Sequence, residues 1–168
     1  MSITSLLPEH YSWVCLGLFG TILANTYLTV IVVKARRKYG IQLPNLYATA
    51  DMIDPKSKCK TKADMDAYNS AQRCHQQTAE NISTIQICGV VNGLLFPRFA
   101  GICLGLYAVG RIIYGKGYSG AGPTGRQLGG LISHTGDIPL FFCCAYSAAV
   151  LSGYASADGL FNVFNLFA

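Results

Sequence analysis

A polar stretch in the middle of the chain has the residue types and the spacing of a binding site. Arg73, Gln77 and Glu80 follow one another at i, i+4 and i+7, so they lie on one face of a predicted helix. Guanidinium groups pair with carboxylates and phosphates, and a glutamate accepts hydrogen bonds from ammonium groups. Two interpretations stay open: the stretch binds a small ligand, or Arg73 pairs with Glu80 and only holds helices together.

A second stretch further along the chain presents a similar face. Arg111, Tyr114 and Tyr118 also share one side of a predicted helix, and both stretches adjoin long apolar runs. An ionised side chain inside a membrane costs several kcal/mol, so it turns inward, where it pairs or lines a site. We therefore expect the two polar faces to meet inside a helical bundle.

Arginines outnumber the acids that could neutralise them in this region. The arginines are Arg36, Arg37, Arg73, Arg111 and Arg126. Glu80 is the single acid close to them within an apolar span. Because buried arginines without a carboxylate partner favour an anion, the excess predicts a site for a small polyanionic ligand at one end of the helices.

The composition indicates that a lipid bilayer surrounds the elements that position these residues. The chain is 51% hydrophobic and 12% charged, whereas soluble globular chains are about 25% charged. A net charge of +5 could indicate nucleic acid, but nine of the 13 lysines and arginines lie between Lys34 and Arg73, beside apolar runs. A loop next to a membrane explains this better, so no nucleic-acid partner is expected.

The hydrophobic pattern predicts an all-α integral membrane protein, a four-transmembrane-helix bundle that forms a single domain of residues 1–168. The predicted spans are residues 11–33, 72–96, 99–118 and 128–151. A polar loop of residues 34–71 follows the first span, and an apolar tail of residues 152–168 ends the chain. In the fourth span, Asp137 and Pro139 predict a kink.

The distribution of basic residues predicts the orientation. The first and third loops hold most of the cations, including Lys116 and Arg126, whereas the second loop holds only Arg98. With four spans, the first and third loops lie on the same side. The positive-inside rule places that side in the cytosol, or in an equivalent matrix, with both termini opposite.

The seven cysteines show no pattern that indicates chemistry. Their number is odd, they form no C-x-x-C pair, and five of them lie inside apolar stretches, where a free cysteine behaves as a small hydrophobe. We therefore expect neither a disulfide framework nor a metal site.

Several short motifs together resemble one family. They are Lys34-Ala-Arg36-Arg37-Lys38-Tyr39 after the first span, Arg73 followed by Glu80 in the second, and Arg111-x-x-Tyr114-x-x-Gly117-Tyr118 followed by Arg126. In this order and spacing they resemble the membrane-associated proteins in eicosanoid and glutathione metabolism (MAPEG). The resemblance covers the chain from about Tyr11 to Leu151.

The resemblance implies a homotrimer that binds its co-substrate, glutathione, between neighbouring subunits. It implies a glutathione transferase or peroxidase that acts on lipophilic substrates in the endoplasmic reticulum or a mitochondrial membrane. Arg126 would stabilise the glutathione thiolate, and Arg37 would face the lipophilic substrate. The implied glutathione-binding residues are Thr29, Arg36, Arg73, His75, Gln77, Glu80, Arg111, Tyr114 and Tyr118. The chemistry agrees, because a guanidinium favours the thiolate that must attack.

Two positions depart from the family pattern. Gln77 stands where the family usually has asparagine, and its extra methylene could displace the peptide by about 1 Å, which can cost ~10²-fold in rate. Asn81 stands where relatives commonly have an aromatic or aliphatic residue. The family also includes a lipid-presenting scaffold, so a non-catalytic accessory subunit, in a membrane assembly of unlike subunits, stays open as an alternative.

Asp137 is an acid that the resemblance does not supply. An ionisable residue inside a membrane is a candidate functional residue by default. The alternative is that Asp137 pairs with His134, one helical turn earlier in the chain. The sequence leaves both interpretations open.

Overall fold

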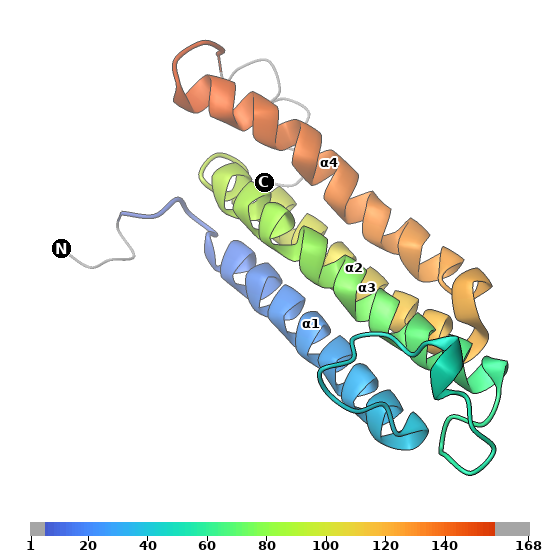
Figure 1. Ribbon diagram of the computed structural model, residues 1–168. Helices are drawn as coiled ribbons and strands as arrows, with labels where there is room; N and C mark the ends of the chain where they lie inside the picture. The colour runs from blue at the N-terminus through green and yellow to red at the C-terminus, as the bar shows by residue number, and fades with distance from the viewer. Residues whose placement is uncertain (1–5, 157–168) are drawn as a thin grey trace.

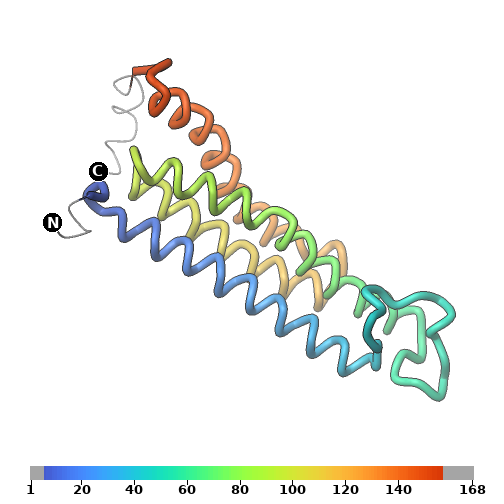
Figure 2. Tube along the Cα trace, turned by 60° about the vertical axis from the view of Figure 1, so that its left-hand side comes forward, coloured from blue at the N-terminus to red at the C-terminus, as the bar shows by residue number. Residues whose placement is uncertain are grey.

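Four long α-helices form one bundle in the computed structural model, which describes residues 6–156 (Figure 1). The helices are α1 (Ser12–Tyr39), α2 (Lys62–Gly93), α3 (Pro97–Ala121) and α4 (Gln127–Leu151), with the short 3-10 helices η2 (Ala50–Met52) and η3 (Gly122–Thr124) between them. Successive helices run in opposite directions (Figure 2). The loop of residues 40–61 and the η3 connection therefore lie at the same end of the bundle, which we name the loop end.

Local sequence sets where α1 ends and α2 begins. Gly40 adopts the left-handed conformation with φ of 70°, and its N–H donates to the carbonyl of Arg36 at 2.9 Å. At the start of α2, Thr61 and Asp64 form a reciprocal capping box. The polar loop is accordingly residues 40–61, shorter than the 34–71 that the sequence predicts, because both helices continue into the charged segments.

The loop packs on the first turns of α2. Ile41, Ala48, Cys59 and Tyr68 form a small buried cluster of their own. The hydroxyl of Tyr68 donates to the carbonyl of Leu46 at 3.0 Å. This packing holds the loop over the loop end of the bundle, next to the predicted arginine site.

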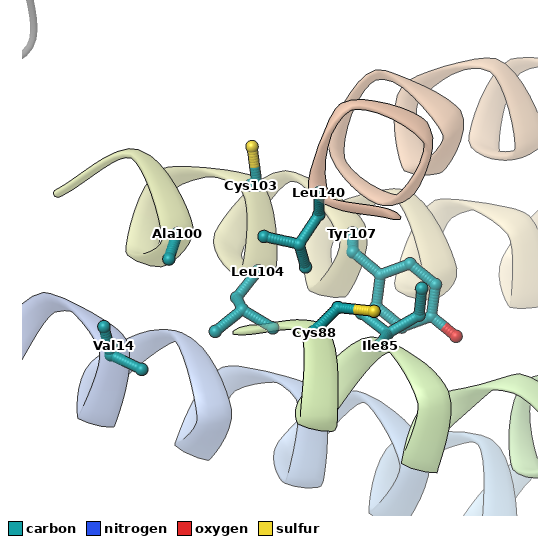
Figure 3. Close-up of a cluster of buried hydrophobic side chains, with 8 residues drawn as sticks. All are labelled: Val14, Ile85, Cys88, Ala100, Cys103, Leu104, Tyr107 and Leu140. Atoms are coloured by element: carbon teal, nitrogen blue, oxygen red, sulfur yellow. The ribbon is translucent and has the colours of Figure 1, made fainter. Parts of the chain in front are cut away.

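A cluster of buried side chains from all four helices forms the core away from the loop end (Figure 3). Its members are Val14, Ile85, Cys88, Ala100, Cys103, Leu104, Tyr107 and Leu140. Leu104 and Leu140 are fully buried. None of the seven cysteines, all of which lie in the described residues, forms a disulfide. The cysteines of this core act as small apolar side chains.

Two further contacts fix α4 on the bundle. Asn92 on α2 donates to the carbonyl of Leu140 at 2.8 Å and accepts from the hydroxyl of Ser147 at 2.7 Å. Nearer the loop end, Gly129 lies directly against the backbone of Tyr114, where an added Cβ would collide with the Tyr114 nitrogen. This close approach brings the start of α4 next to the polar face of α3.

Three of the described helical segments are long and apolar enough to cross a membrane. They are Ser12–Tyr39, Pro97–Thr124 and Gln127–Leu151. Helix α2 is not among them because polar residues such as Glu80, Gln86 and Asn92 interrupt its second half as well as its first, so its passage through the membrane stays a prediction. Helix α4 continues through Pro139. Of the predicted apolar tail, residues 157–168 lie outside the described residues.

Candidate functional site

The polar face of α3 packs against α2 near the loop end, where Gln77 reaches it. Tyr114 on α3 donates its hydroxyl to Oε1 of Gln77 on α2. Arg111, Tyr114 and Tyr118 are all buried, and the two tyrosine rings meet edge to face with centroids 5.6 Å apart. The three α3 residues that the sequence singles out thus line the inside of the bundle.

Arg111 is a buried cation that neutral groups hold in place. Its guanidinium donates to Oγ1 of Thr78 from Nε at 2.8 Å and from a terminal nitrogen at 2.5 Å. Thr78 in turn donates to the carbonyl of Cys74 at 3.1 Å. The guanidinium carbon lies 4.3 Å from the centre of the Tyr114 ring. No carboxylate of residues 6–156 forms an ion pair with Arg111.

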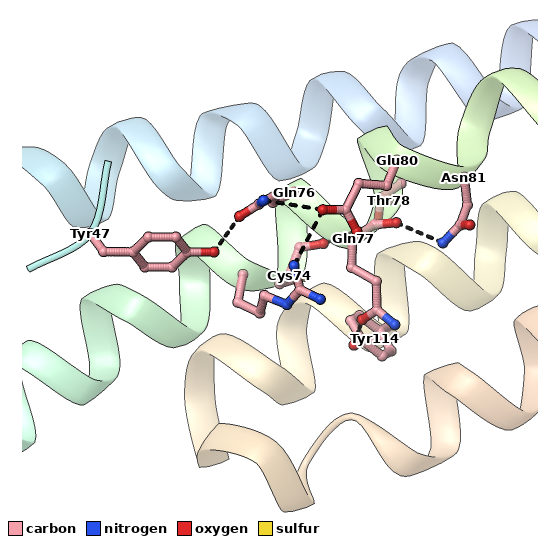
Figure 4. A network of polar contacts seen from close by, with 9 residues as sticks. Tyr47, Cys74, Gln76, Gln77, Thr78, Glu80, Asn81 and Tyr114 are labelled. Atoms are coloured by element: carbon pink, nitrogen blue, oxygen red, sulfur yellow. Dashed lines mark hydrogen bonds and ion pairs between the residues drawn. The ribbon is translucent and has the colours of Figure 1, made fainter. Parts of the chain in front are cut away.

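On α2, by contrast, Arg73 and Glu80 are exposed on the single chain, and Glu80 belongs to a polar network with Gln76 (Figure 4). Their side chains are about half exposed, and Arg73 pairs with Glu80 at 3.3 Å. Gln76 donates to the same oxygen of Glu80 at 3.1 Å and accepts from the hydroxyl of Tyr47 in the loop. Of the predicted α2 face, Gln77 therefore reaches the α3 face, whereas Arg73 and Glu80, about 40° and 60° away from it around the helix axis, stay exposed.

A separate polar contact joins α1 to α2 at the same depth. Oγ1 of Thr29 lies 3.0 Å from Nε2 of His75. Both are residues that the family resemblance implies for the glutathione site. Thr29 lies on α1 and His75 on the side of α2 that faces α1, so the pair links the two helices.

Arg126 stands at the mouth of this region. It is the residue before α4, and its guanidinium carbon lies 5.5 Å from the centre of the Tyr118 ring. Arg126 is itself exposed. Tyr118 and Arg73 line the same open hollow of about 500 Å³, together with Tyr47 and Asn69. Arg126, Tyr118 and Arg73 therefore belong to one neighbourhood of the single chain.

Arg36 and Arg37 belong to a different neighbourhood. Both line a second hollow of about 420 Å³ at the end of α1, together with Lys58. The Arg36 guanidinium donates to the carbonyls of Asn45 at 2.8 Å and Ile41 at 3.3 Å. Within one chain the structure thus brings the predicted arginines together as two groups, one at the end of α1 and one between α2, α3 and the start of α4.

Comparison with known proteins identifies the family to which the chain belongs. The model of the MAPEG family matches residues 14–146, which is most of the chain and runs from α1 into α4. The chain belongs to the MAPEG family. The family includes glutathione transferases and leukotriene C4 synthase-like enzymes, which use glutathione as a substrate. MAPEG membership and the three membrane-crossing segments make the chain an integral membrane protein.

Two residues of this polar cluster are not predicted from the sequence. Thr78 accepts hydrogen bonds from the buried Arg111. The feature of the sequence that could have indicated this is a small hydroxyl residue next to Gln77, on a helix predicted to lie in the membrane. Tyr47 reaches Gln76 from the loop, and no helical spacing could indicate that contact. The described residues contain no group of three or more metal-ligating side chains.

Proposed function

We propose that this chain is a membrane-bound glutathione transferase or peroxidase, of the type of microsomal glutathione S-transferase 3. It would activate the glutathione thiolate for attack on lipophilic electrophiles or lipid hydroperoxides. The observation that carries the proposal is the charge pattern around α2. Arg73 and Glu80 offer one cation and one anion on its surface, and Arg111 lies buried behind them without a carboxylate partner among residues 6–156.

This pattern fits the charges of glutathione. The peptide has two carboxylates, which suit guanidinium groups, and one α-amine, which suits Glu80. The side chains that we assign to binding are Thr29, Arg36, Arg73, His75, Gln77, Glu80, Arg111, Tyr114 and Tyr118. Arg126 would hold the thiol as thiolate, since an adjacent guanidinium lowers the pKa of a thiol. Arg37 would face the second substrate.

A trimer would join the two groups of arginines. Arg36 and Arg37 line one hollow of the chain and Arg73 lines another. A site between subunits lets the end of α1 of one copy face α2 of the next. It would also cover Arg73 and Glu80, whose exposure within a bundle in the membrane is otherwise costly. We therefore propose a homotrimer, in the endoplasmic reticulum or a mitochondrial membrane, with the loop end in the cytosol or matrix.

Arg126→Ala tests whether the Arg126 guanidinium stabilises the sulfur of glutathione as a thiolate. The variant, in detergent, should lose the absorbance of the glutathione thiolate and the turnover of an aryl halide and of a fatty-acid hydroperoxide. Its affinity for glutathione should remain close to that of the native protein. Lys116→Ala removes an exposed charge from the end of α3 and is the matched control. Native protein without turnover on either acceptor, or an unchanged thiolate in Arg126→Ala, would contradict the proposal.

A second function is favoured by one specific observation. Arg73 already pairs with Glu80, and Tyr114 already donates to Gln77. Some polar groups of the proposed site therefore have partners within the chain without a ligand. A non-catalytic accessory subunit of a larger membrane assembly would show this arrangement. Purification in a mild detergent distinguishes the two functions. The proposed enzyme should purify as a complex of three identical chains, whereas an accessory subunit should purify together with chains of other proteins.

A further inference from the structure

Positive charge is concentrated in the segment that joins α1 to α2. Residues 34–62 hold eight of the 13 lysines and arginines of the chain and only two acids, Asp51 and Asp54. Six of the eight cations are lysines, and all six lysines are exposed. No lysine among residues 6–156 forms an ion pair. This charge is therefore available to an anion from outside the chain.

The acids of this region bind backbone N–H groups instead of lysine side chains. Oδ1 of Asp54 accepts from the N–H of Lys56 at 2.8 Å. Oδ2 of Asp64 accepts from the N–H of Lys60 at 3.1 Å and from that of Thr61 at 3.0 Å. These carboxylates hold the backbone of the loop in shape. The ammonium groups of the lysines keep their charge for another partner.

The loop exposes a lysine at every second position. Lys56, Lys58 and Lys60 are exposed, whereas Ser57 is half-buried and Cys59 is buried. The hydroxyl of Ser57 donates to the carbonyl of Cys59 at 2.9 Å. Cys59 also belongs to the small buried cluster of the loop. The inward residues thus anchor the segment, and the three lysines between and beside them stay at its surface.

Lys58 connects this row of lysines to the end of α1. Its Nζ donates to the carbonyl of Arg37 at 3.4 Å, and its side chain lies against Gly40, where an added Cβ would be 3.2 Å from the Lys58 Cβ. Lys58 and Arg37 line the same hollow of about 420 Å³. Lys34 stands three residues before Arg37, on the same side of α1. We name Lys34, Lys56, Lys58 and Lys60 the lysine face.

The lysine face begins at the level of the lipid head groups. The uncharged run of residues 11–33 ends directly before Lys34, so Lys34 marks the edge of the hydrocarbon layer. Arg37, whose carbonyl Lys58 contacts, follows about 4.5 Å further along the helix axis. The head-group layer on each side of a bilayer is about 5–7 Å deep. Lys58 therefore reaches the depth at which lipid phosphates lie.

An exposed leucine accompanies these charges. Leu43 lines the same hollow as Lys58, and 78% of its area is accessible. The guanidinium of Arg36 donates to the carbonyls of Ile41 and Asn45, so this stretch of the loop lies beside the last turn of α1 (Figure 1). A leucine exposed among cations suits the boundary between head groups and acyl chains better than it suits water.

We propose that the lysine face and Leu43 dock on anionic phospholipids of the bilayer that holds the helices. The head-group phosphate would lie between Lys58 and Lys34, and Leu43 would contact the acyl chains beneath it. The proposed orientation places this face on the side of the membrane where anionic lipids are concentrated. None of these four residues belongs to the proposed glutathione site, so the docking does not depend on that chemistry.

Native mass spectra of the full-length protein in a mild detergent test the proposal. Titration with phosphatidylglycerol and with phosphatidylcholine gives a dissociation constant for each bound lipid. Phosphatidylglycerol should bind more tightly, and Lys58→Gln should weaken it by about fivefold, the effect of one basic residue at an anionic surface, while phosphatidylcholine binds as before. Lys116→Gln removes an exposed lysine at the same end of the bundle, outside the lysine face, and should leave both constants unchanged.

Hydrogen exchange in nanodiscs provides a second measurement at the docking surface itself. Phosphatidylglycerol added to phosphatidylcholine nanodiscs should slow the exchange of residues 41–46 in the native protein but not in Lys58→Gln. The variant should keep the native affinity for glutathione, so the two proposals fail separately. Equal affinity for the two lipids, equal weakening by Lys58→Gln and Lys116→Gln, or displacement of phosphatidylglycerol by equimolar inorganic phosphate would overturn the docking.

Discussion

The guanidinium of Arg111 donates two hydrogen bonds to the single hydroxyl oxygen of Thr78, at 2.8 Å and 2.5 Å. Both residues are buried, and the guanidinium also lies over the rings of Tyr107 and Tyr114. Neutral partners thus orient the charge without cancelling it. Arg111 therefore keeps its attraction for an anion, which an internal carboxylate would have removed.

Thr78→Val should destabilise the protein. Valine has nearly the same shape but cannot accept the two hydrogen bonds, and a buried charged donor that loses its partner costs about 3 kcal/mol or more. Thermal unfolding in detergent measures the effect. Thr84→Val, an exposed position on the same helix, should change the melting temperature little. Equal melting temperatures for the two variants would show that Thr78 does not hold Arg111.

Glu80→Gln should reduce glutathione affinity with little effect on stability. The exposed pair with Arg73 contributes about 0–1 kcal/mol to folding, whereas a charge-assisted bond to the α-amine of the ligand corresponds to about tenfold in affinity or more. Calorimetric titration with glutathione and with an analogue without the amine separates these effects. The variant should weaken only glutathione. An equal loss for both ligands would place the amine elsewhere.

Gln77→Asn should improve catalysis if the chain is the proposed enzyme. Asparagine restores the family residue and removes a methylene, and correcting a displacement of about 1 Å can raise the rate by up to ~10²-fold. Steady-state kinetics with a hydroperoxide acceptor measures kcat/KM. Gln86→Asn is the control, because Gln86 lies deeper on α2 and donates to Thr21 instead. A drop in kcat/KM would mean that the bond from Tyr114 to Gln77 positions the site.

The sequence predicts the helices and the orientation of α3 better than it predicts the site as a whole. The uncharged run of residues 11–33 leaves little alternative to a helix in lipid. The helical spacing of Arg111, Tyr114 and Tyr118 predicts one face, and all three are buried together. The sequence predicts that the second span begins at residue 72, whereas α2 begins at Lys62, because its capping residues Thr61 and Asp64 lie among charges that are typical of a loop.

The rest of the site depends on how helices rotate about their own axes. A shift of one residue along α2 turns a side chain by a quarter of a circle or more, which decides whether Arg73 faces Arg111 or the outside. Spacing within one helix fixes which residues share a face but not what that face meets. The same reasoning explains Arg36, whose guanidinium turns to the carbonyl of Asn45 in the loop, a contact that no periodic pattern encodes.

Cys59 should make stability depend on pH at the alkaline end. Burial in the loop cluster, and then the charge of Asp64, raises the pKa of the Cys59 thiol above its ordinary value. The folded state therefore holds this proton more tightly than the unfolded chain. The resulting stability is present below the ordinary thiol pKa and is lost as the pH rises through the raised value.

Melting curves at neutral and alkaline pH check this for the native protein and for Cys59→Ala. The native protein should lose more stability on alkalinisation than the variant. Cys59 should also alkylate slowly at neutral pH, because the thiolate is the reactive form. The same pH dependence in both proteins would show that the titration of Cys59 contributes nothing.

Gly129→Ala should separate α4 from α3 and disturb both the fold and the site. The added Cβ would collide with the Tyr114 backbone, which cannot give way without moving α3. Gly130→Ala is a close control, because its Cβ would meet the Tyr114 ring at 3.8 Å, an ordinary contact, and alanine favours the helix. We expect Gly129→Ala to lower the melting temperature and the affinity for glutathione together, since Tyr114 and Arg126 shift with the two helices, while Gly130→Ala retains both. If Gly129→Ala loses stability but binds glutathione as the native protein does, Tyr114 lies outside the binding site.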